Sequence, residues 1–348
     1  MTIVAEKYDY VIGVDTHART HTYAIVHAAN GACAVTEAFP TTPAAIARSL
    51  AWAKRNTSGR VLAAVEGTSS YGAGLTRALT RASIEVTEVK PPRKASRAGL
   101  GKSDPIDAVV AARHVLARDI TKLTTPRAEG IRGALRVLLT GRRGLDIHST
   151  ANRNALNALA RTVDLGIDAR KPLSNTQITN IAAWRPRSAD TIEQRIARVE
   201  ATRLATAIKA ANTQLRDSKK RLAGLCEQVA PGLQDLVGLG PVTAAILLTA
   251  YSHHGRIRSE AAFAALAGVS PLPASSGNTV RYRLNRHGDR QLNMALDVIV
   301  KVRMMRDDDT KRYVARRTAE GKNYREIKRI LKRYVARNIY RQLQTLMP

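Results

Sequence analysis

Along the first 90 residues, apolar positions fall in short runs of strand length separated by polar turns. Runs of this kind, bounded by Gly, Asn and Asp, are typical of β-strands. The expected strands lie at residues 8–15, 22–27, 61–65 and 84–89, with a hairpin turn at Asn30-Gly31. Helical spacing predicts helices over residues 43–54 and 75–81. Several strands followed by interspersed helices predict an α/β domain, in an order compatible with a ribonuclease-H-like fold.

Beyond a basic stretch at residues 90–97, the pattern becomes almost wholly helical. Long helices are expected over residues 106–118, 134–163 and 191–229, with an irregular segment at 165–186. In the third of these helices, apolar residues recur at intervals of three, four and their multiples, at Ile196, Val199, Leu204, Ile208, Leu215 and Leu222. This spacing suits a coiled-coil-like hairpin or partner helix, and an ordinary surface helix fits it equally well.

These changes of pattern predict three domains. Residues 1–165 form the α/β domain, residues 166–230 a helical, coiled-coil linker, and residues 231–348 a mainly helical C-terminal domain. In the last domain, Gly238-Leu239-Gly240 resembles the turn of a helix-hairpin-helix, where backbone N–H groups at a helix N-terminus meet a phosphate. An ordinary tight turn before a buried helix fits the same residues.

The charge of the chain narrows the choice of partner. Lys and Arg number 56 against 28 Asp and Glu, a formal net charge of +28. Such an excess implies a nucleic acid or an anionic membrane surface. Residues 311–341 concentrate it, with 12 basic residues against Glu320 and Glu326. A solvated helix face is the usual explanation for such a run, but this excess is larger than solubility requires.

Other features exclude several protein classes. Cys33 and Cys226 are the only cysteines, so neither a disulfide framework nor a structural zinc site is expected. Residues 1–7 do not resemble a secretory signal, and the longest apolar segment, 242–251, is too short to span a bilayer. We therefore expect a soluble cytoplasmic protein with no membrane partner.

Four carboxylates are the candidate metal ligands of the chain. Asp15 and Glu66 end apolar strands, while Asp104 and Asp107 lie one helical turn apart. Oxygen donors suit magnesium, and two ions about 4 Å apart could activate an attacking oxygen and stabilise a leaving one. The alternative is that Ser-Asp-Pro-Ile-Asp is a helix start with capping acids. His17, His21 and His27 are more typical of structural or solvent-facing positions, and His253-His254 of a loop.

A loop in the C-terminal domain combines serines with regularly spaced arginines. Ser275-Ser276-Gly277 is followed by Arg281, Arg283, Arg286 and Arg290. Small residues permit close approach of a nucleic-acid backbone, and arginines pair with phosphates through two hydrogen bonds. By itself, a Ser-Ser-Gly loop is normally only a turn.

Taken together, these motifs resemble the bacterial insertion-sequence transposases of the one-ten family, DNA recombinases guided by a bridge RNA. The matching segments are Ile12–Asp15, Val65–Thr68, Lys102–Ala108, Val237–Ala244, Ala267–Pro271 and Ser276-Gly277 with the following arginines. The family implies a RuvC-like N-terminal domain, a coiled-coil linker and a C-terminal transposase domain. It implies that Asp15, Glu66, Asp104 and Asp107 bind metal and that Ser276 is the nucleophile, with Ser275 as the open alternative. It also implies a homodimer or tetramer that joins one protomer's acidic site to another's serine.

The sequence therefore predicts an RNA-guided transposase that uses magnesium and acts on donor and target DNA with a non-coding guide RNA. The expected nucleic-acid contacts are Arg281, Arg283, Arg286, Arg290, Lys328, Arg329, Lys332 and Arg333. One rival is a metal-dependent junction-resolving nuclease in which water attacks. The other is a nucleic-acid-binding protein without enzymatic activity.

Overall fold

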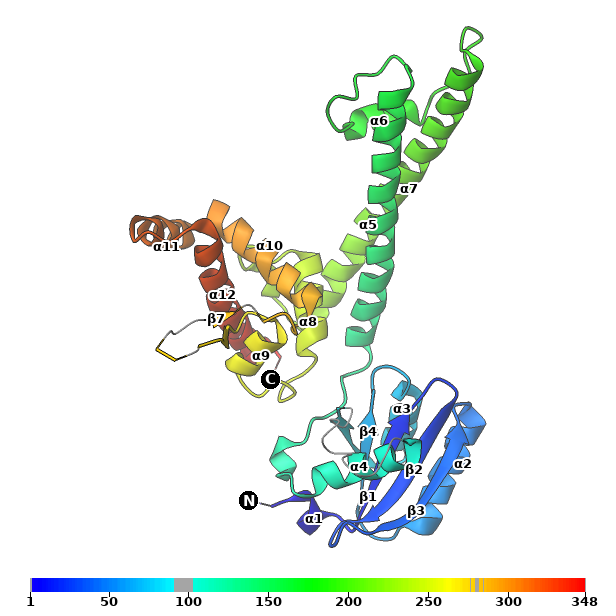
Figure 1. Cartoon of the computed structure of the whole chain (residues 1–348), viewed down its shortest axis with the longest axis vertical. Coiled ribbons are helices and arrows are strands. Elements are labelled where there is room, and N and C mark those ends of the chain that lie inside the picture. The colour runs from blue at the N-terminus through cyan, green and yellow to red at the C-terminus, as the bar shows by residue number, and fades with distance from the viewer. Residues whose placement is uncertain (1, 91–102, 276, 279–281, 284, 348) are drawn as a thin grey trace. The chain divides into compact units, whose positions relative to one another are not determined.

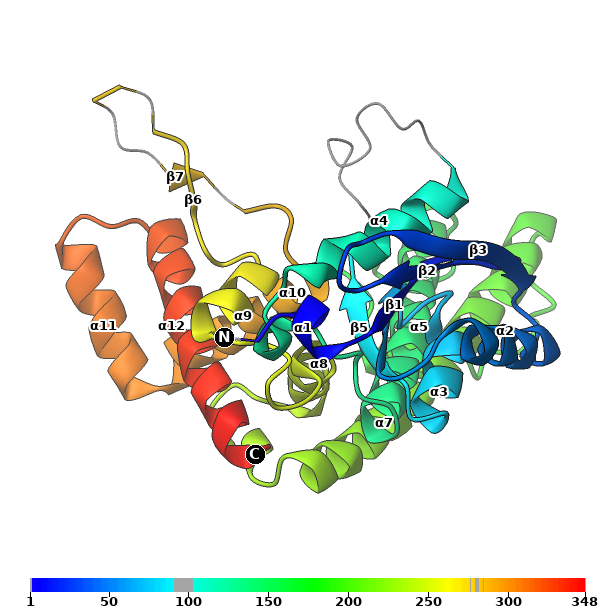
Figure 2. The ribbon, with the colours of Figure 1, turned by 90° about the horizontal axis from the view of Figure 1, so that it is seen from below.

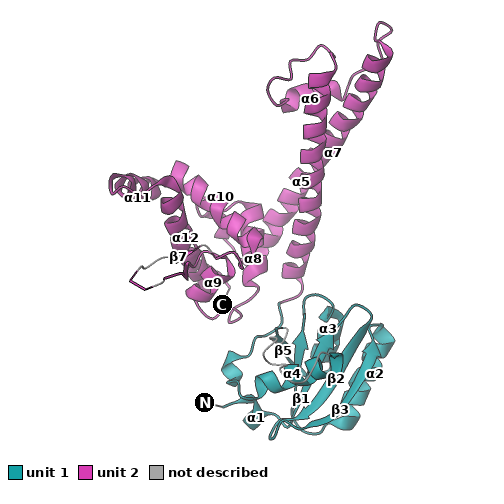
Figure 3. Ribbon diagram, in the orientation of Figure 1, with its two compact units in different colours: residues 1–127 teal, residues 128–348 magenta. Residues whose placement is uncertain are grey.

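The computed structural model describes residues 2–90, 103–275, 277–278, 282–283 and 285–347 (Figure 1). The chain forms two compact units, residues 1–127 and 128–348 (Figure 3). This division falls earlier than the predicted domain boundary at residue 165, because helix α5 (Ile131–Thr162) packs along α7 (Ile192–Val229) within the second unit. The functional division at residues 165 and 230 stays a prediction.

The first unit is built on a mixed five-stranded sheet, in the order β3-β2-β1-β4-β5. Three antiparallel strands come first, β1 (Tyr10–Thr16), β2 (Thr20–His27) and β3 (Cys33–Pro40), and then β4 (Val61–Glu66) and β5 (Glu85–Val89) run parallel to β1. This topology confirms the predicted α/β class of ribonuclease-H-like order.

Alternation along the central strand explains why both faces of the sheet are covered. Ile12 and Val14 pack beneath α2 (Pro43–Asn56) and α3 (Ala73–Arg81), together with an aromatic cluster of Tyr23, Phe39 and Trp52. Val11 belongs to the opposite core, which α4 (Asp104–Leu116) and the short α1 (Val4–Lys7) close. Figure 2 shows α4 on one side of the sheet and α2 and α3 on the other. A 3₁₀ turn, η2 (Ile120–Lys122), follows α4.

A long helical hairpin opens the second unit, as the spacing predicted. Helices α5 and α7 run side by side and α6 (Asn175–Ile181) packs near their tip (Figure 1). Leu204, Ile208 and Leu222 are buried, but Ile196 and Val199 are 62% and 57% exposed. The apolar spacing therefore follows the buried seam at some of its positions and the exposed side of α7 at Ile196 and Val199. Near the tip, the buried seam is instead made of small alanines such as Ala197, Ala201 and Ala205.

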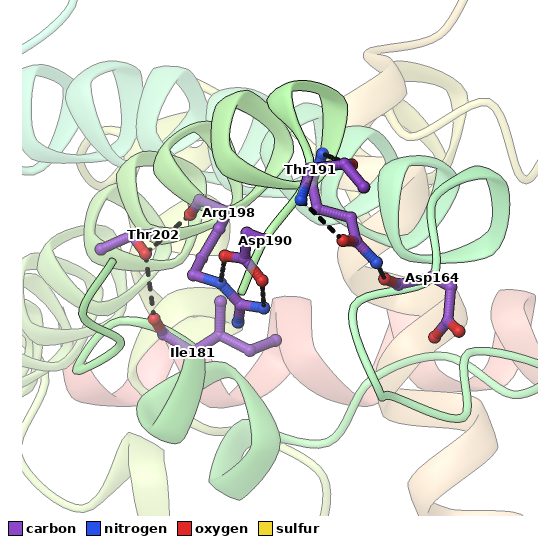
Figure 4. A network of polar contacts seen from close by, with 7 residues as sticks. Asp164, Ile181, Asp190, Thr191, Arg198 and Thr202 are labelled. Atoms are coloured by element: carbon purple, nitrogen blue, oxygen red, sulfur yellow. Dashed lines mark hydrogen bonds and ion pairs between the residues drawn. The ribbon is translucent and has the colours of Figure 1, made fainter. Parts of the chain in front are cut away.

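An ion pair braces the tip of this hairpin. Arg198 Nε and Nη2 donate to the two carboxylate oxygens of Asp190 at 2.5 and 2.9 Å, and both residues are buried (Figure 4). The guanidinium also lies over the Trp184 ring, 4.8 Å from its centroid. The hydrogen bond from Arg198 lowers the pKa of Asp190, so the pair stays charged. Thr191 begins α7 with a capping box in the same network.

The rest of the second unit is a helical bundle around a buried α8 (Pro241–Tyr251). It contains the 3₁₀ turn η3 (Leu233–Asp235), α9 (Glu260–Leu266), the small hairpin β6 (Leu272–Pro273) and β7 (Tyr282–Arg283), α10 (Arg290–Arg306), α11 (Asp308–Ala319) and α12 (Tyr324–Leu346). Figure 2 shows α12 between α9 and α11, and both neighbours contact it. No described helix is long and apolar enough to cross a membrane.

The basic run at residues 311–341 forms two helices where the sequence suggested one continuous helical face. The chain turns at Gly321, whose φ of +81° is readily adopted only by glycine. Asn323 then starts α12 with a capping box formed with Glu326. The basic run is therefore divided between α11 and α12, which contact each other.

Candidate active site

Two of the predicted carboxylates end neighbouring parallel strands of the sheet. β1 and β4 pair with Val14 opposite Val65, so Asp15 and Glu66 follow at the same edge. Alternation from Val11 and from Leu62 turns both residues toward the α4 face. Thr16 Oγ1 donates to the Glu66 carbonyl oxygen at 3.0 Å and ties the two strand ends together. The sheet therefore places Asp15 and Glu66 side by side.

The other two carboxylates reach this edge because α4 crosses β1 at unusually close range. A Cβ atom on Gly13 would lie 2.0 Å from the carbonyl oxygen of Ala108 and 2.9 Å from the Cβ of Ala112. Only glycine permits this approach, since any side chain would collide with the helix backbone. Asp104 and Asp107 lie in the first turn of α4, just ahead of Ala108. The contact at Gly13 thus carries the acidic end of the helix toward Asp15.

The start of α4 also bears on the alternative that these acids are helix caps. Ser103 occupies the N-cap position, and its side chain accepts no capping hydrogen bond. Asp104 lies inside the first turn with its side chain 52% exposed, whereas Asp107 is buried. Neither Asp104 nor Asp107 therefore occupies the N-cap position of α4.

His17 joins the cluster, although its sequence context was more typical of a structural position. Its Nε2 atom lies 3.1 Å from Asp15 Oδ2 and 3.6 Å from Asp104 Oδ1. Ligand atoms of Asp15, His17 and Asp104 all lie within 4.8 Å of one another. The turn after β1 brings it back, with His17 N–H donating to the Thr20 carbonyl at 3.1 Å. The spacing Asp-x-His at a strand end is the signal that could have identified it.

The other two histidines in this region, His21 and His27, lie away from the carboxylates. His21 is buried within β2, and burial lowers its pKa. His27 lies at the far end of β2, where its ring is 4.9 Å from that of Tyr10. Neither belongs to the carboxylate cluster.

The electrostatics of the site fit a divalent cation. Burial raises the pKa of Asp15, contact with His17 opposes that rise, and the nearby charges of Asp104 and Asp107 add to it. A buried carboxylate among like charges is unfavourable until a cation compensates it. Carboxylate oxygens are the ligands that magnesium prefers, and an imidazole nitrogen is better suited to manganese or zinc. Among the described residues, Asp15, His17 and Asp104 place ligand atoms close enough together to share an ion, while Asp107 acts on Asp15 through its charge and Glu66 ends the neighbouring strand.

A surface hollow of about 560 Å³ opens beside this cluster. It is lined by strands β2 and β3 and by the start of α4, at Thr22, Thr36, Glu37, Ala38, Ser103, Asp104 and Pro105. β3 is an edge strand with mostly exposed residues, so the hollow is open to an approaching polymer. Asp104 lies on its wall, which gives the cluster access to a substrate.

The predicted residues of the C-terminal loop are only partly described. Ser276 and Arg281 lie outside the described residues, while Ser275 is exposed. Arg283 and Arg286 line one hollow near the β6–β7 hairpin, and Arg286 and Arg290 line another. Lys328, Arg329, Lys332 and Arg333 all line a larger groove along α12.

Two models of transposase families match two separate parts of the chain. A family model for DEDD transposases of the IS110 type, described as "Transposase", matches residues 12–163. A second, described as "Transposase IS116/IS110/IS902 family", matches residues 230–315. The first contains all four predicted carboxylates and the second contains Ser276.

Among individual proteins, the chain is similar to an uncharacterized 43.6 kDa protein of insertion element IS110 from Streptomyces coelicolor. The two are 30% identical over 124 residues. The aligned stretch covers 35% of this chain and 31% of that relative, so the match spans about a third of either protein.

Proposed function

Because the chain belongs to the IS110 family of transposases, we propose that it moves a mobile DNA element by cleaving and rejoining DNA strands. The observation that supports this most directly is the close group of Asp15, His17 and Asp104, whose ligand atoms all lie within 4.8 Å of one another. Asp15 and Glu66 end adjacent strands, and the first turn of α4 adds Asp104 and Asp107. A basic protein gains nothing in nucleic-acid affinity from such a cluster, whereas a metal-dependent nuclease requires it.

The acidic residues would hold divalent metal, magnesium in our proposal. When bound, the metal supplies Lewis-acid stabilisation of the charge that develops on the reacting phosphate and the leaving oxygen. The protein supplies the geometry: Gly13 lets α4 approach, and the paired strand ends hold Asp15 and Glu66 in register. His17 keeps its imidazole against Asp15 and Asp104 and orients both carboxylates.

In the finer mechanism that we propose, Ser276 is the nucleophile. Its Oγ attacks a DNA phosphorus atom, and the P–O bond to one sugar breaks. The released sugar oxygen takes up a proton, and the serine hydroxyl loses one. Attack of another strand's hydroxyl on the phosphoserine ester then restores the serine and completes strand exchange. Support comes from the position of Ser276 beside Gly277 and before a series of arginines, within the part of the chain that matches a transposase family model.

The proposed partners are donor and target DNA and a non-coding guide RNA that selects the sites by base pairing. The net charge of +28 supports a polyanionic partner. We also propose a homodimer or tetramer that combines one protomer's acidic site with another's serine. Sequencing the RNA that copurifies with the protein tests the first of these two proposals, and light scattering in the presence of DNA tests the second.

Strand cleavage and adduct formation test the proposed chemistry. On labelled, nicked DNA, the wild-type protein should give a covalent, protease-sensitive adduct on denaturing gels only when Mg²⁺ or Mn²⁺ is present. Ser276→Ala should lose the adduct, and its matched control Ser275→Ala should retain it. Asp104→Asn should lose cleavage while still binding DNA.

The same gels separate the rival functions. Metal-dependent cleavage without any adduct would identify a nuclease in which water attacks. Binding without cleavage under any condition would leave a nucleic-acid-binding protein.

A further inference from the structure

We propose that the groove along α12 binds an unpaired polynucleotide strand, with a backbone phosphate at Lys328 and Lys332 and a base stacked on Tyr334. This inference deepens the proposed function and rests on it only in requiring that the protein handle nucleic acid. The α12 groove is a surface hollow of about 730 Å³ between residues 268–271, α10 and α12.

Charge is the first property that indicates the ligand. Seven basic side chains and a single carboxylate line the α12 groove: Arg283, Arg325, Lys328, Arg329, Lys332, Arg333 and Arg337, with Asp297. A second hollow shares Gly268, Asn285, Asn293, Asp297 and Lys332 with it and adds Arg286 and Arg290. The positive lining therefore continues toward the loop that carries the serines. A chain of phosphates fits such a lining, because its charge is distributed along its length.

The half-buried carboxylate of Asp297 organises three lysines, of which Lys328 and Lys332 line the groove. Asp297 accepts from Lys332 at 2.7 Å, from Lys301 at 2.9 Å and from Lys328 at 3.2 Å. Lys332 also donates to Asn293 Oδ1 at 3.1 Å, and Asn293 is fixed in turn by its bond to the Ala267 carbonyl. One carboxylate leaves most of the charge of three lysines uncompensated. Each ammonium has three donors, so Lys328 and Lys332 can still donate to a phosphate oxygen.

Asp297 remains ionised throughout the neutral range. Burial alone would raise its pKa, but hydrogen bonds from Lys332, Lys301 and Lys328 outweigh that effect and lower the pKa below its usual value. The lysines are thus held in place before a ligand arrives, which reduces the entropy lost on binding.

The wall formed by α12 contains both paired and unpaired arginines. Glu260 accepts from Arg337 at 3.0 Å and lies 3.5 Å from Arg333. Among the residues that the structure describes, no carboxylate lies within ion-pair distance of Arg325 or Arg329. Their guanidinium groups are free to take phosphates on either side of the lysine cluster.

An exposed aromatic ring indicates that the strand is unpaired. Tyr334 lines the groove and is 51% exposed, and its ring makes an edge-type contact with that of Tyr313, with ring centroids 6.0 Å apart. A rigid, half-exposed ring beside phosphate-binding residues is the usual arrangement for stacking a base of single-stranded nucleic acid. Bases within a duplex are already stacked on one another and cannot use it.

Fluorescence anisotropy with the full-length protein tests this proposal, using labelled single-stranded DNA, single-stranded RNA and duplex DNA. Tyr334→Leu removes the ring but keeps a large apolar side chain, and Tyr334→Phe is the matched control that keeps the ring. We expect Tyr334→Leu to weaken single-strand binding about 5-fold to 150-fold and Tyr334→Phe to bind like the wild type. Duplex binding should be unchanged in both. Whichever of single-stranded DNA and single-stranded RNA binds more tightly is identified as the ligand of the groove.

The phosphate contact has its own pair of variants. Lys332→Gln should reduce the log–log salt slope for single strands by about 0.7, as expected for one lost phosphate contact. Lys311→Gln, on α11 and paired with Asp308, should leave that slope unchanged. Thermal melting of each variant checks that the fold is intact.

Two results would overturn the inference while leaving the transposase proposal standing. One is single-strand binding by Tyr334→Leu equal to that of Tyr334→Phe. The other is an equal loss for duplex and single strands, which would make the groove a general basic surface. Absence of all nucleic-acid binding by the wild type would overturn both proposals at once.

Discussion

At the scale of single residues, the acidic site shows how burial and like charge act against stability in the absence of metal. Asp15 is only 7% exposed and lies near Asp104 and Asp107, with His17 as its hydrogen-bonding neighbour. Burial is the main cause that raises the pKa of Asp15. The folded protein therefore binds a proton at Asp15 more readily than the unfolded chain does, and the ionised form destabilises the fold.

Because ionised Asp15 destabilises the fold, replacing it with a neutral residue, as in Asp15→Asn, should stabilise the protein in the absence of metal. At neutral pH without metal, the variant should melt at a higher temperature than the wild type, because it has no buried charge. The difference should shrink as pH falls through the raised pKa of Asp15, where the wild-type carboxyl becomes neutral. Cleavage should nevertheless fall by about 100-fold or more, since a metal ligand is lost.

Metal addition provides the control for this variant. Mg²⁺ or Mn²⁺ should raise the melting temperature of the wild type and should raise that of Asp15→Asn much less. Equal stabilisation of both proteins by metal would mean that Asp15 is not a ligand.

At the scale of elements, the close crossing of α4 over β1 decides whether the carboxylates meet. Gly13→Ala would place a methyl group against the backbone carbonyl of Ala108, and backbone cannot move aside as a flexible side chain can. We expect a destabilisation of about 1–3 kcal/mol, the usual effect of overpacking, and loss of metal-dependent cleavage. Chemical denaturation and the nicking assay measure the two effects.

Gly74→Ala is the matched control for that change. Its new Cβ on α3 would lie 3.6 Å from Ile46 Cδ1 on α2, an ordinary van der Waals contact. Stability should rise slightly, by at most about 1 kcal/mol, because alanine favours a helix over glycine. If Gly13→Ala behaves like Gly74→Ala, the crossing does not depend on glycine.

The helical hairpin offers a second test at this scale. Ile208 is fully buried between α5 and α7, whereas Ile196 on the same helix is 62% exposed. Ile208→Ala should reduce the free energy of unfolding by about 2–5 kcal/mol and Ile196→Ala by no more than about 0.5 kcal/mol. Similar losses for the two variants would contradict the different burial of the two residues.

At the scale of the whole molecule, the net charge of +28 should dominate nucleic-acid affinity. Each neutralised phosphate contributes about −0.7 to −0.9 to the slope of log affinity against log salt. We expect a steep slope for the intact protein, and a flatter one without altered sequence preference when several of Lys328, Arg329, Lys332 and Arg333 are replaced. A slope near zero in binding titrations would show that these residues do not form the binding surface.

The sequence by itself determined the local elements and their chemistry. Short apolar runs and helical spacing identified the α/β unit, the long helices and the acids at strand ends, because periodicity reflects which faces of each element are buried. The motifs at both ends of the chain, taken together, were enough to indicate the family.

Only the tertiary structure decided which residues meet. His17 lies close to Asp104 of α4, far away in the sequence, and Asp297 organises lysines from two helices that are likewise far apart in the sequence. Spacing likewise grouped Ile196 with Ile208, whereas packing buried only the second. Periodicity describes one element at a time, and it cannot specify which neighbour covers a face or how closely two elements approach. Those outcomes depend on long-range contacts, which form only when the whole unit folds.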